Sequence, residues 1–101
     1  RLPGLPPPSV QPGPGLGSLA VSWAPVVLAT GFRVELRPAG VQAAWSVVDA
    51  AEGKLVSGAA AAETVSRFPA AHGTCKVSGL PSNVVFEARV TYVTACGCWS
   101  D

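Results

Sequence analysis

Apolar and polar side chains alternate one by one through residues 84 to 94, and this alternation constrains the fold more than any other feature of the chain. One set of alternate positions is apolar: Phe86, Ala88, Val90 and Tyr92. The set between them is polar: Glu87, Arg89 and Thr91. A repeat of two residues places successive side chains on opposite faces, as in a β-strand with one buried face. The segment therefore predicts a long strand.

Several shorter segments carry the same repeat or a short apolar run. They lie at residues 18–26, 31–37, 45–48, 54–56 and 74–78. Pro25, Gly40 and Gly79 stand at their ends, where turns are expected, and Glu52-Gly53 is a candidate hairpin turn. No segment shows a convincing amphipathic helix, so the class is all-β. The expected core consists of the apolar alternate positions Leu19, Val21, Trp23, Phe32, Val34, Leu36, Val77, Phe86 and Val90.

Length and charge limit the partners that the chain is expected to have. The 101 residues suffice for one domain, and the seven basic and six acidic side chains leave a formal charge of +1. This balance gives no electrostatic reason to expect nucleic acid as a partner. Residues 2 to 32 carry no charge, but the prolines and glycines among them would break a membrane-spanning helix. We therefore expect no membrane insertion of this segment.

Four segments, taken in order, make the chain similar to a fibronectin type III domain. They are Pro7-Pro8-Ser9-Val10, residues 18–25 with Trp23, residues 31–37, and residues 77–90 with the corner Gly79-Leu80-Pro81. The resemblance implies an immunoglobulin-like two-sheet sandwich with Trp23 in its core. An immunoglobulin domain would instead carry cysteines on its second and sixth strands and a tryptophan on its third. We expect residues 1–8 to be a proline-rich linker and residues 9–101 to form the domain.

Three departures from this family pattern stand out. Phe86 takes the place of a tyrosine whose hydroxyl usually ties down the corner. The distance from Trp45 to Leu80 is about twice the family's, which predicts an insertion at about residues 49–73. The last strand of the family is missing or truncated, although Trp99-Ser100 resembles half of the Trp-Ser-x-Trp-Ser signature of cytokine receptors.

Charged residues on two of the predicted strands form the candidate binding site. They are Arg33, Glu35, Arg37, Glu87 and Arg89. If the two strands are neighbours, as the resemblance implies, opposite charges can pair across them. The surface is then either a polar contact face for a partner protein or a solvated face that keeps the sheet soluble.

The three cysteines allow several interpretations. Alternation turns Cys75 and Cys96 inward, which makes them a candidate disulfide and leaves Cys98 over. Alternatively, all three stay reduced as small apolar side chains. His72 and the cysteines could supply a zinc ligand set, but their spacing fits no zinc motif, so no metal and no cofactor are predicted.

The sequence contains no constellation of acid, base and nucleophile, so we expect no enzyme. The predicted function is a non-catalytic protein–protein interaction module within a larger multidomain protein, of the cell adhesion or scaffold kind. Its binding surface would be the charged face or the insertion at residues 49–73. A structural spacer that binds nothing is the alternative, and a metal or redox role for the cysteines and His72 is a distant one. Extracellular, cell-surface and intracellular scaffold locations remain equally compatible with the sequence.

Overall fold

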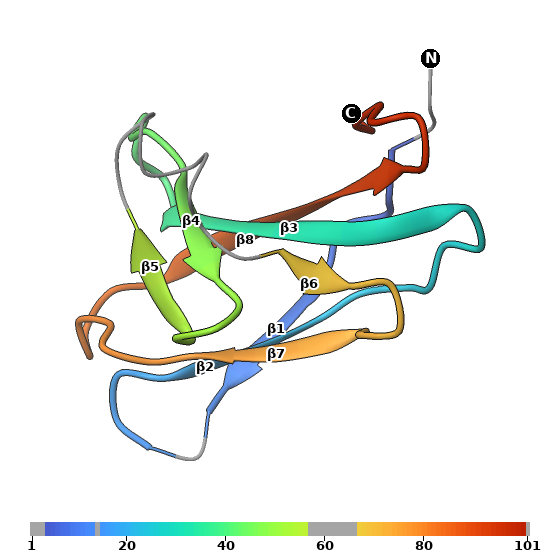
Figure 1. The fold of residues 1–101 in the computed structure, drawn as a ribbon. Helices are drawn as coiled ribbons and strands as arrows, with labels where there is room; N and C mark the ends of the chain where they lie inside the picture. The colour runs from blue at the N-terminus through green and yellow to red at the C-terminus, as the bar shows by residue number, and fades with distance from the viewer. Residues whose placement is uncertain (1–3, 14, 57–66, 101) are drawn as a thin grey trace.

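The computed structural model describes residues 4–13, 15–56 and 67–100, and this part of the chain forms strands in two sheets without a helix (Figure 1). The three-stranded sheet has the order β1-β2-β7 and contains β1 (Ser9–Pro12), β2 (Leu19–Ser22) and β7 (Thr74–Val77). The five-stranded sheet contains β3 (Ala29–Pro38), β4 (Ser46–Asp49), β5 (Lys54–Val56), β6 (Phe68–Pro69) and β8 (Phe86–Thr94). The predicted all-β, two-sheet architecture is confirmed.

The long strand β3 organises the five-stranded sheet. One of its edges pairs antiparallel with β8 over almost its whole length, from Ala29 opposite Thr94 to Pro38 opposite Phe86. Its other edge is shared, because β4 pairs with its second half and β6 with its first half. A bulge at Thr30 shifts the register, and the Thr30 hydroxyl donates a hydrogen bond to the Val93 carbonyl at 3.1 Å. The β3–β8 pair is therefore the longest strand pairing in the described structure.

The core lies between the two sheets and consists of the positions that alternation predicts. Seven of the nine predicted core residues are buried: Val21, Trp23, Phe32, Val34, Leu36, Val77 and Val90. Leu19 and Phe86 are only half-buried, although they pack against the core, because each is the first residue of its strand. Burial of these side chains is the main contribution to stability that the fold offers.

Trp23 lies directly after β2 and closes the core at one end of the sandwich. Its ring centroid is 5.6 Å from that of Phe32 and 5.7 Å from that of Phe68. Its backbone N–H donates to the Gly73 carbonyl at 2.9 Å, which ties it to the chain before β7. The indole Nε1 is buried and has no hydrogen-bond partner within the described part of the chain. An unmet buried donor typically costs about 1–3 kcal/mol.

The hairpin between β4 and β5 forms at the predicted turn. The Gly53 N–H donates to the Asp49 carbonyl at 2.7 Å, and Gly53 has a φ of 67°, in the left-handed region that glycine favours. The first part of the predicted insertion at residues 49–73 is thus a strand that extends the sheet beyond β4. Residues 57–66 lie outside the described residues. After them, β6 pairs with β3 and the chain turns back, with the His72 N–H donating to the Pro69 carbonyl at 3.0 Å.

The segments at the two chain ends both run beside β8. Residues 4–8 form no strand, but Leu5 packs against the core and the segment lines a shallow groove with residues 88–91 of β8. Trp99 forms a single antiparallel bridge with Val93. Within residues 4–13, 15–56 and 67–100, no helix has the length and hydropathy needed to cross a bilayer.

Candidate functional site on the outer face of the five-stranded sheet

The five predicted site residues lie together on the face of the five-stranded sheet that points away from the core. Their strands β3 and β8 are neighbours, and the register places Glu35 opposite Arg89 and Arg37 opposite Glu87, while Arg33 lies opposite Thr91. The inward positions between them hold core residues such as Val34 and Leu36. We call this surface the outer face.

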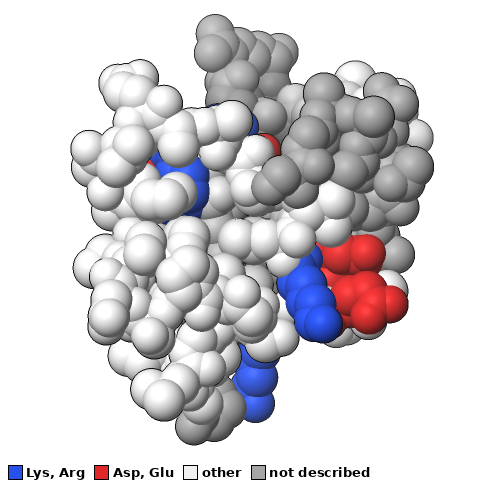
Figure 2. Space-filling model, turned by 90° about the vertical axis from the view of Figure 1, so that its left-hand side faces the viewer, with Lys and Arg blue, Asp and Glu red and all other residues white. Residues whose placement is uncertain are grey.

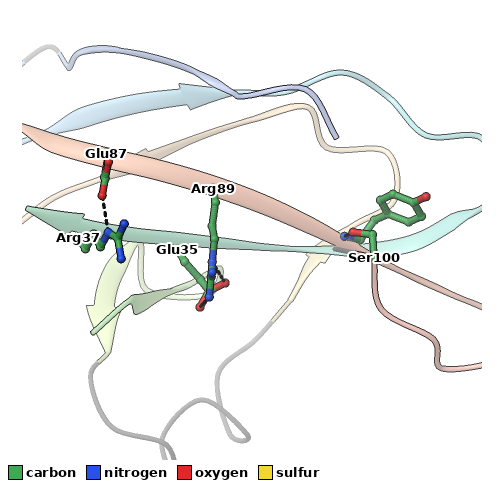
Figure 3. A network of polar contacts seen from close by, with 6 residues as sticks. Glu35, Arg37, Glu87, Arg89 and Ser100 are labelled. Atoms are coloured by element: carbon green, nitrogen blue, oxygen red, sulfur yellow. Dashed lines mark hydrogen bonds and ion pairs between the residues drawn. The ribbon is translucent and has the colours of Figure 1, made fainter. Parts of the chain in front are cut away.

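Opposite charges on the outer face pair across the ladder, as the sequence predicts (Figure 3). Arg89 donates two hydrogen bonds to Glu35, from Nε to Oε1 at 2.9 Å and from Nη2 to Oε2 at 3.3 Å. The Arg37 Nε donates to the Glu87 carboxylate. Two parallel bonds from one guanidinium fix the geometry of a carboxylate better than a single contact does. The Glu35–Arg89 pair is therefore the better defined of the two.

Glu35 departs from the expectation of a solvated face. Only 11% of its side chain is exposed, whereas 50% of the Arg89 side chain and 41% of the Glu87 side chain are exposed. A buried carboxylate needs hydrogen-bond partners to offset its lost hydration, and Arg89 supplies two. On this face Glu35 therefore lies close to the sheet, and arginine side chains lie between it and the solvent.

A tryptophan that the sequence analysis did not select lies over these pairs. The Arg37 Cζ is 4.3 Å and the Arg89 Cζ 4.4 Å from the ring centroid of Trp45, the residue just before β4. Contacts of a guanidinium with an aromatic ring at this distance are cation–π interactions. Each of the two arginines therefore contacts both a carboxylate and an indole ring.

A second tryptophan stack lies further along the same sheet. The Arg33 Cζ is 4.2 Å and the Arg67 Cζ 5.0 Å from the ring centroid of Trp99. The chain on either side of this ring is anchored to β8. The Ser100 N–H donates to the Tyr92 carbonyl at 2.8 Å, and the Ser100 Oγ accepts from the Tyr92 N–H at 2.9 Å (Figure 3). Ser100 is consequently buried although it lies near the end of the described chain.

Three residues of the outer face were therefore missing from the sequence-based site: Trp45, Arg67 and Trp99. Trp45 and Trp99 lie outside regular strands, where alternation predicts no facing direction. One sequence feature could have indicated these contacts: two tryptophans flank strands that carry arginines at alternate positions. Which arginine meets which ring depends on the pairing of β3 with β8, which joins residues far apart in the sequence, for example Arg37 and Glu87, 50 residues apart.

The cysteines do not form the candidate disulfide in this structure. All three thiols are free: Cys75 is buried in β7, whereas Cys96 and Cys98 are exposed. The expectation that Cys96 faces inward is wrong, because β8 ends at Thr94 and Cys96 lies in the following turn. Burial raises the pKa of the Cys75 thiol to about 11, and a backbone hydrogen bond from Val21 opposes this only in part.

The candidate zinc ligands do not come together either. Among the described residues no group of three or more His, Cys, Asp and Glu side chains is arranged to hold a metal ion. The His72 ring instead lies near Phe68, with ring centroids 6.2 Å apart. Two features that drew attention in the sequence, His72 and Cys75, are thus separated from the exposed pair Cys96 and Cys98.

The surface around the outer face also has a hollow and exposed apolar side chains. A shallow hollow of about 290 Å³ lies beside the outer face and is lined by Arg37, Gly40, Val41, Gln42 and Glu87. Val41 is 57% exposed. The end of the sandwich that is turned toward the viewer in Figure 2 is covered mostly by neutral residues. The loops before β2 and before β8 expose Leu16, Val84 and Val85.

The outer face combines guanidinium, carboxylate and indole groups that can contact a partner. Among residues 4–13, 15–56 and 67–100, four arginines and two glutamates meet there, which leaves two positive charges in excess. Planar cationic and aromatic groups of this kind bind carboxylates and apolar side chains. Searches for similar protein families, for characterised relatives and for solved structures of similar fold found no match.

Proposed function

We propose that this chain is a module of the fibronectin type III kind that binds a partner protein through its outer face, without catalysing a reaction. The order β1-β2-β7 in one sheet, opposed by a sheet in which β3 pairs with β4 and β8, supports this kind of sandwich. The burial of Trp23 beside Phe32 supports it further.

The observation that carries the binding proposal is the pair of arginine–tryptophan stacks. Tryptophan and arginine are the residues that most often dominate the energy of protein interfaces. Here Arg37 and Arg89 are held by both a carboxylate and Trp45 before any partner arrives. Side chains that are already ordered lose less conformational entropy on binding. The excess of two positive charges among the described residues of this face favours a partner with an acidic surface, and the mainly polar hollow beside Arg37 can receive a polar side chain.

A structural spacer remains the second candidate, and one observation favours it. Four of the five predicted site residues satisfy one another in ion pairs, so the outer face requires no partner to be stable. Such a surface could simply stiffen the five-stranded sheet and fix the distance between neighbouring domains.

Replacing arginines on the outer face separates the two functions. The variant Arg33→Gln/Arg37→Gln removes two charges from the stacks, and its matched control Lys54→Gln/Lys76→Gln removes two charges from exposed positions in β5 and β7. The unaltered chain and the two variants are first checked for folding by thermal melting. Each of the three proteins is then immobilised, and the proteins that it captures are identified by mass spectrometry. A binding module loses specific partners with the arginine variant alone. A spacer gives the same result with all three proteins.

A further inference from the structure

Two exposed thiols face each other in the turn that follows β8. Cys96 and Cys98 flank Gly97, whose φ of 81° lies in the left-handed region. The Gly97 N–H donates to the Thr94 carbonyl at 2.9 Å, and the Thr94 N–H donates to the Cys98 carbonyl at 3.1 Å. These bonds fold the three residues into a tight turn in which the Cys98 thiol hydrogen-bonds the Cys96 sulfur. The turn therefore presents a dithiol to solvent.

The surroundings of the two sulfurs make them chemically different. The hydrogen bond from Cys98, together with one from Thr94 whose Oγ1 is 3.1 Å from the Cys96 Sγ, lowers the pKa of Cys96 to about 7. The hydrogen bond to Cys96 and the negative charge of its thiolate raise the pKa of Cys98. At neutral pH a larger fraction of Cys96 than of Cys98 is therefore a thiolate. Disulfide exchange uses this combination of one nucleophilic thiolate and one resolving thiol.

We propose that Cys96 and Cys98 form a reactive dithiol site that reduces disulfide substrates and becomes an intramolecular disulfide in the process. The site is independent of the outer-face binding proposed above. The buried Cys75 takes no part, since the core shields it from any substrate.

The exchange takes two displacements. The Cys96 thiolate attacks one sulfur of the substrate, the substrate S–S bond breaks, and the departing thiolate takes up the proton of Cys98. The Cys98 thiolate then attacks the Cys96 sulfur, forming the Cys96–Cys98 bond and releasing the second substrate thiolate, which takes a proton from solvent. The protein dithiol loses two electrons and the substrate disulfide gains them. A disulfide requires a short Cα–Cα separation, and the tight turn around Gly97 folds the chain between Cys96 and Cys98.

Oxidised glutathione and the whole 101-residue chain test this site. The reduced protein is incubated with oxidised glutathione at pH 7, and products are mapped by mass spectrometry of proteolytic peptides. We expect a Cys96–Cys98 disulfide as the final product of the unaltered chain. In Cys98→Ser the reaction stops at a glutathione adduct on Cys96. That adduct should form faster than the adduct on Cys98 in Cys96→Ser, because the hydrogen bond from Thr94 remains to lower the pKa of Cys96.

Controls keep the result decisive. Cys75→Ala should leave the reaction unchanged, and because Cys96 and Cys98 are exposed, their serine variants should melt at the temperature of the unaltered chain. Glutathione adducts that persist on both cysteines without closing the ring would overturn the proposal. So would equal rates in the two serine variants, or no reaction at all.

Discussion

The tryptophans of the two faces of the five-stranded sheet are held by different forces. Trp23 lies on the inner side among Phe32 and Phe68, where removal from water stabilises it. Trp45 lies on the outer side against two arginines, where electrostatic attraction between the guanidinium groups and the ring holds it. The inner face tolerates an indole N–H that has no hydrogen-bond partner among the described residues, whereas on the outer face both ion pairs are hydrogen-bonded. The inner face thus determines whether the chain folds, and the outer face determines which groups it presents.

Truncating the inner tryptophan should have the largest effect. Trp23→Ala removes a large buried side chain and leaves a cavity, which typically costs about 3–5 kcal/mol of unfolding free energy. Trp23→Phe should cost less, because it keeps an aromatic ring beside Phe32 and removes the unmet Nε1 donor. Denaturant unfolding of both variants measures the difference. A loss below about 1 kcal/mol for Trp23→Ala would contradict the inner position of this ring.

The buried thiol extends the comparison to pH. The native pKa of Cys75 is raised to about 11, above its value in the unfolded chain, so the native state keeps a proton that the unfolded state loses. The associated stability is present below about pH 8.5, the pKa of an unperturbed thiol, and is lost as the pH rises toward 11. The loss should reach at most about 1.4 kcal/mol for each pH unit. Comparing Cys75→Ala with the unaltered chain isolates this slope from the titration of other groups; equal slopes would contradict the prediction.

Removing an outer tryptophan should cost less than removing the inner one. Trp45→Ala abolishes two cation–π contacts and should cost about 1–2 kcal/mol in unfolding free energy. Trp45→Phe keeps an aromatic face and should recover more than half of that loss. If Trp45→Ala were as damaging as Trp23→Ala, the contrast between the two faces would be wrong.

The two ion pairs should show the smallest effects, and they should differ. A double-mutant cycle on Glu35→Gln and Arg89→Gln should give a coupling of about 1 kcal/mol, reduced by the exposure of Arg89. The same cycle on Arg37→Gln and Glu87→Gln should give about 0.5 kcal/mol or less, because Glu87 is more exposed than Glu35 and is held by a single bond. Equal couplings would show that the burial of Glu35 has no energetic consequence.

Alternation predicted the inner face well because a period of two directly reports which side of a strand a residue occupies. Val21, Phe32 and Val90 were assigned to the core in this way and are buried. The same rule failed for Cys96, because the alternation was extended past Thr94, where the strand ends. A pattern within a segment gives no information about where a strand stops and a turn begins.

The outer face was predictable only in part. Facing direction placed Arg33, Glu35 and Arg37 on one side, and the family resemblance suggested the strand that pairs with theirs. The burial of Glu35 depends on what covers it, and its cover comes from Arg89 and the stacked Trp45, both remote in sequence. Alternation within one strand does not predict which remote side chains cover a residue. The contacts of Trp45, Trp99 and Arg67 could therefore be identified only in the folded chain.

Nuclear Overhauser spectroscopy can show whether the outer face is ordered in the free domain. We expect cross-peaks from the Trp45 indole protons to the side-chain methylenes of Arg37 and Arg89, and the ring current should shift these methylene signals upfield. Cross-peaks between Trp23 and Phe32 serve as the internal reference for a folded core. The opposite result would be arginine methylene signals at the shifts of an unfolded chain, without cross-peaks to Trp45, while the Trp23 contacts are intact. That result would contradict an ordered outer face.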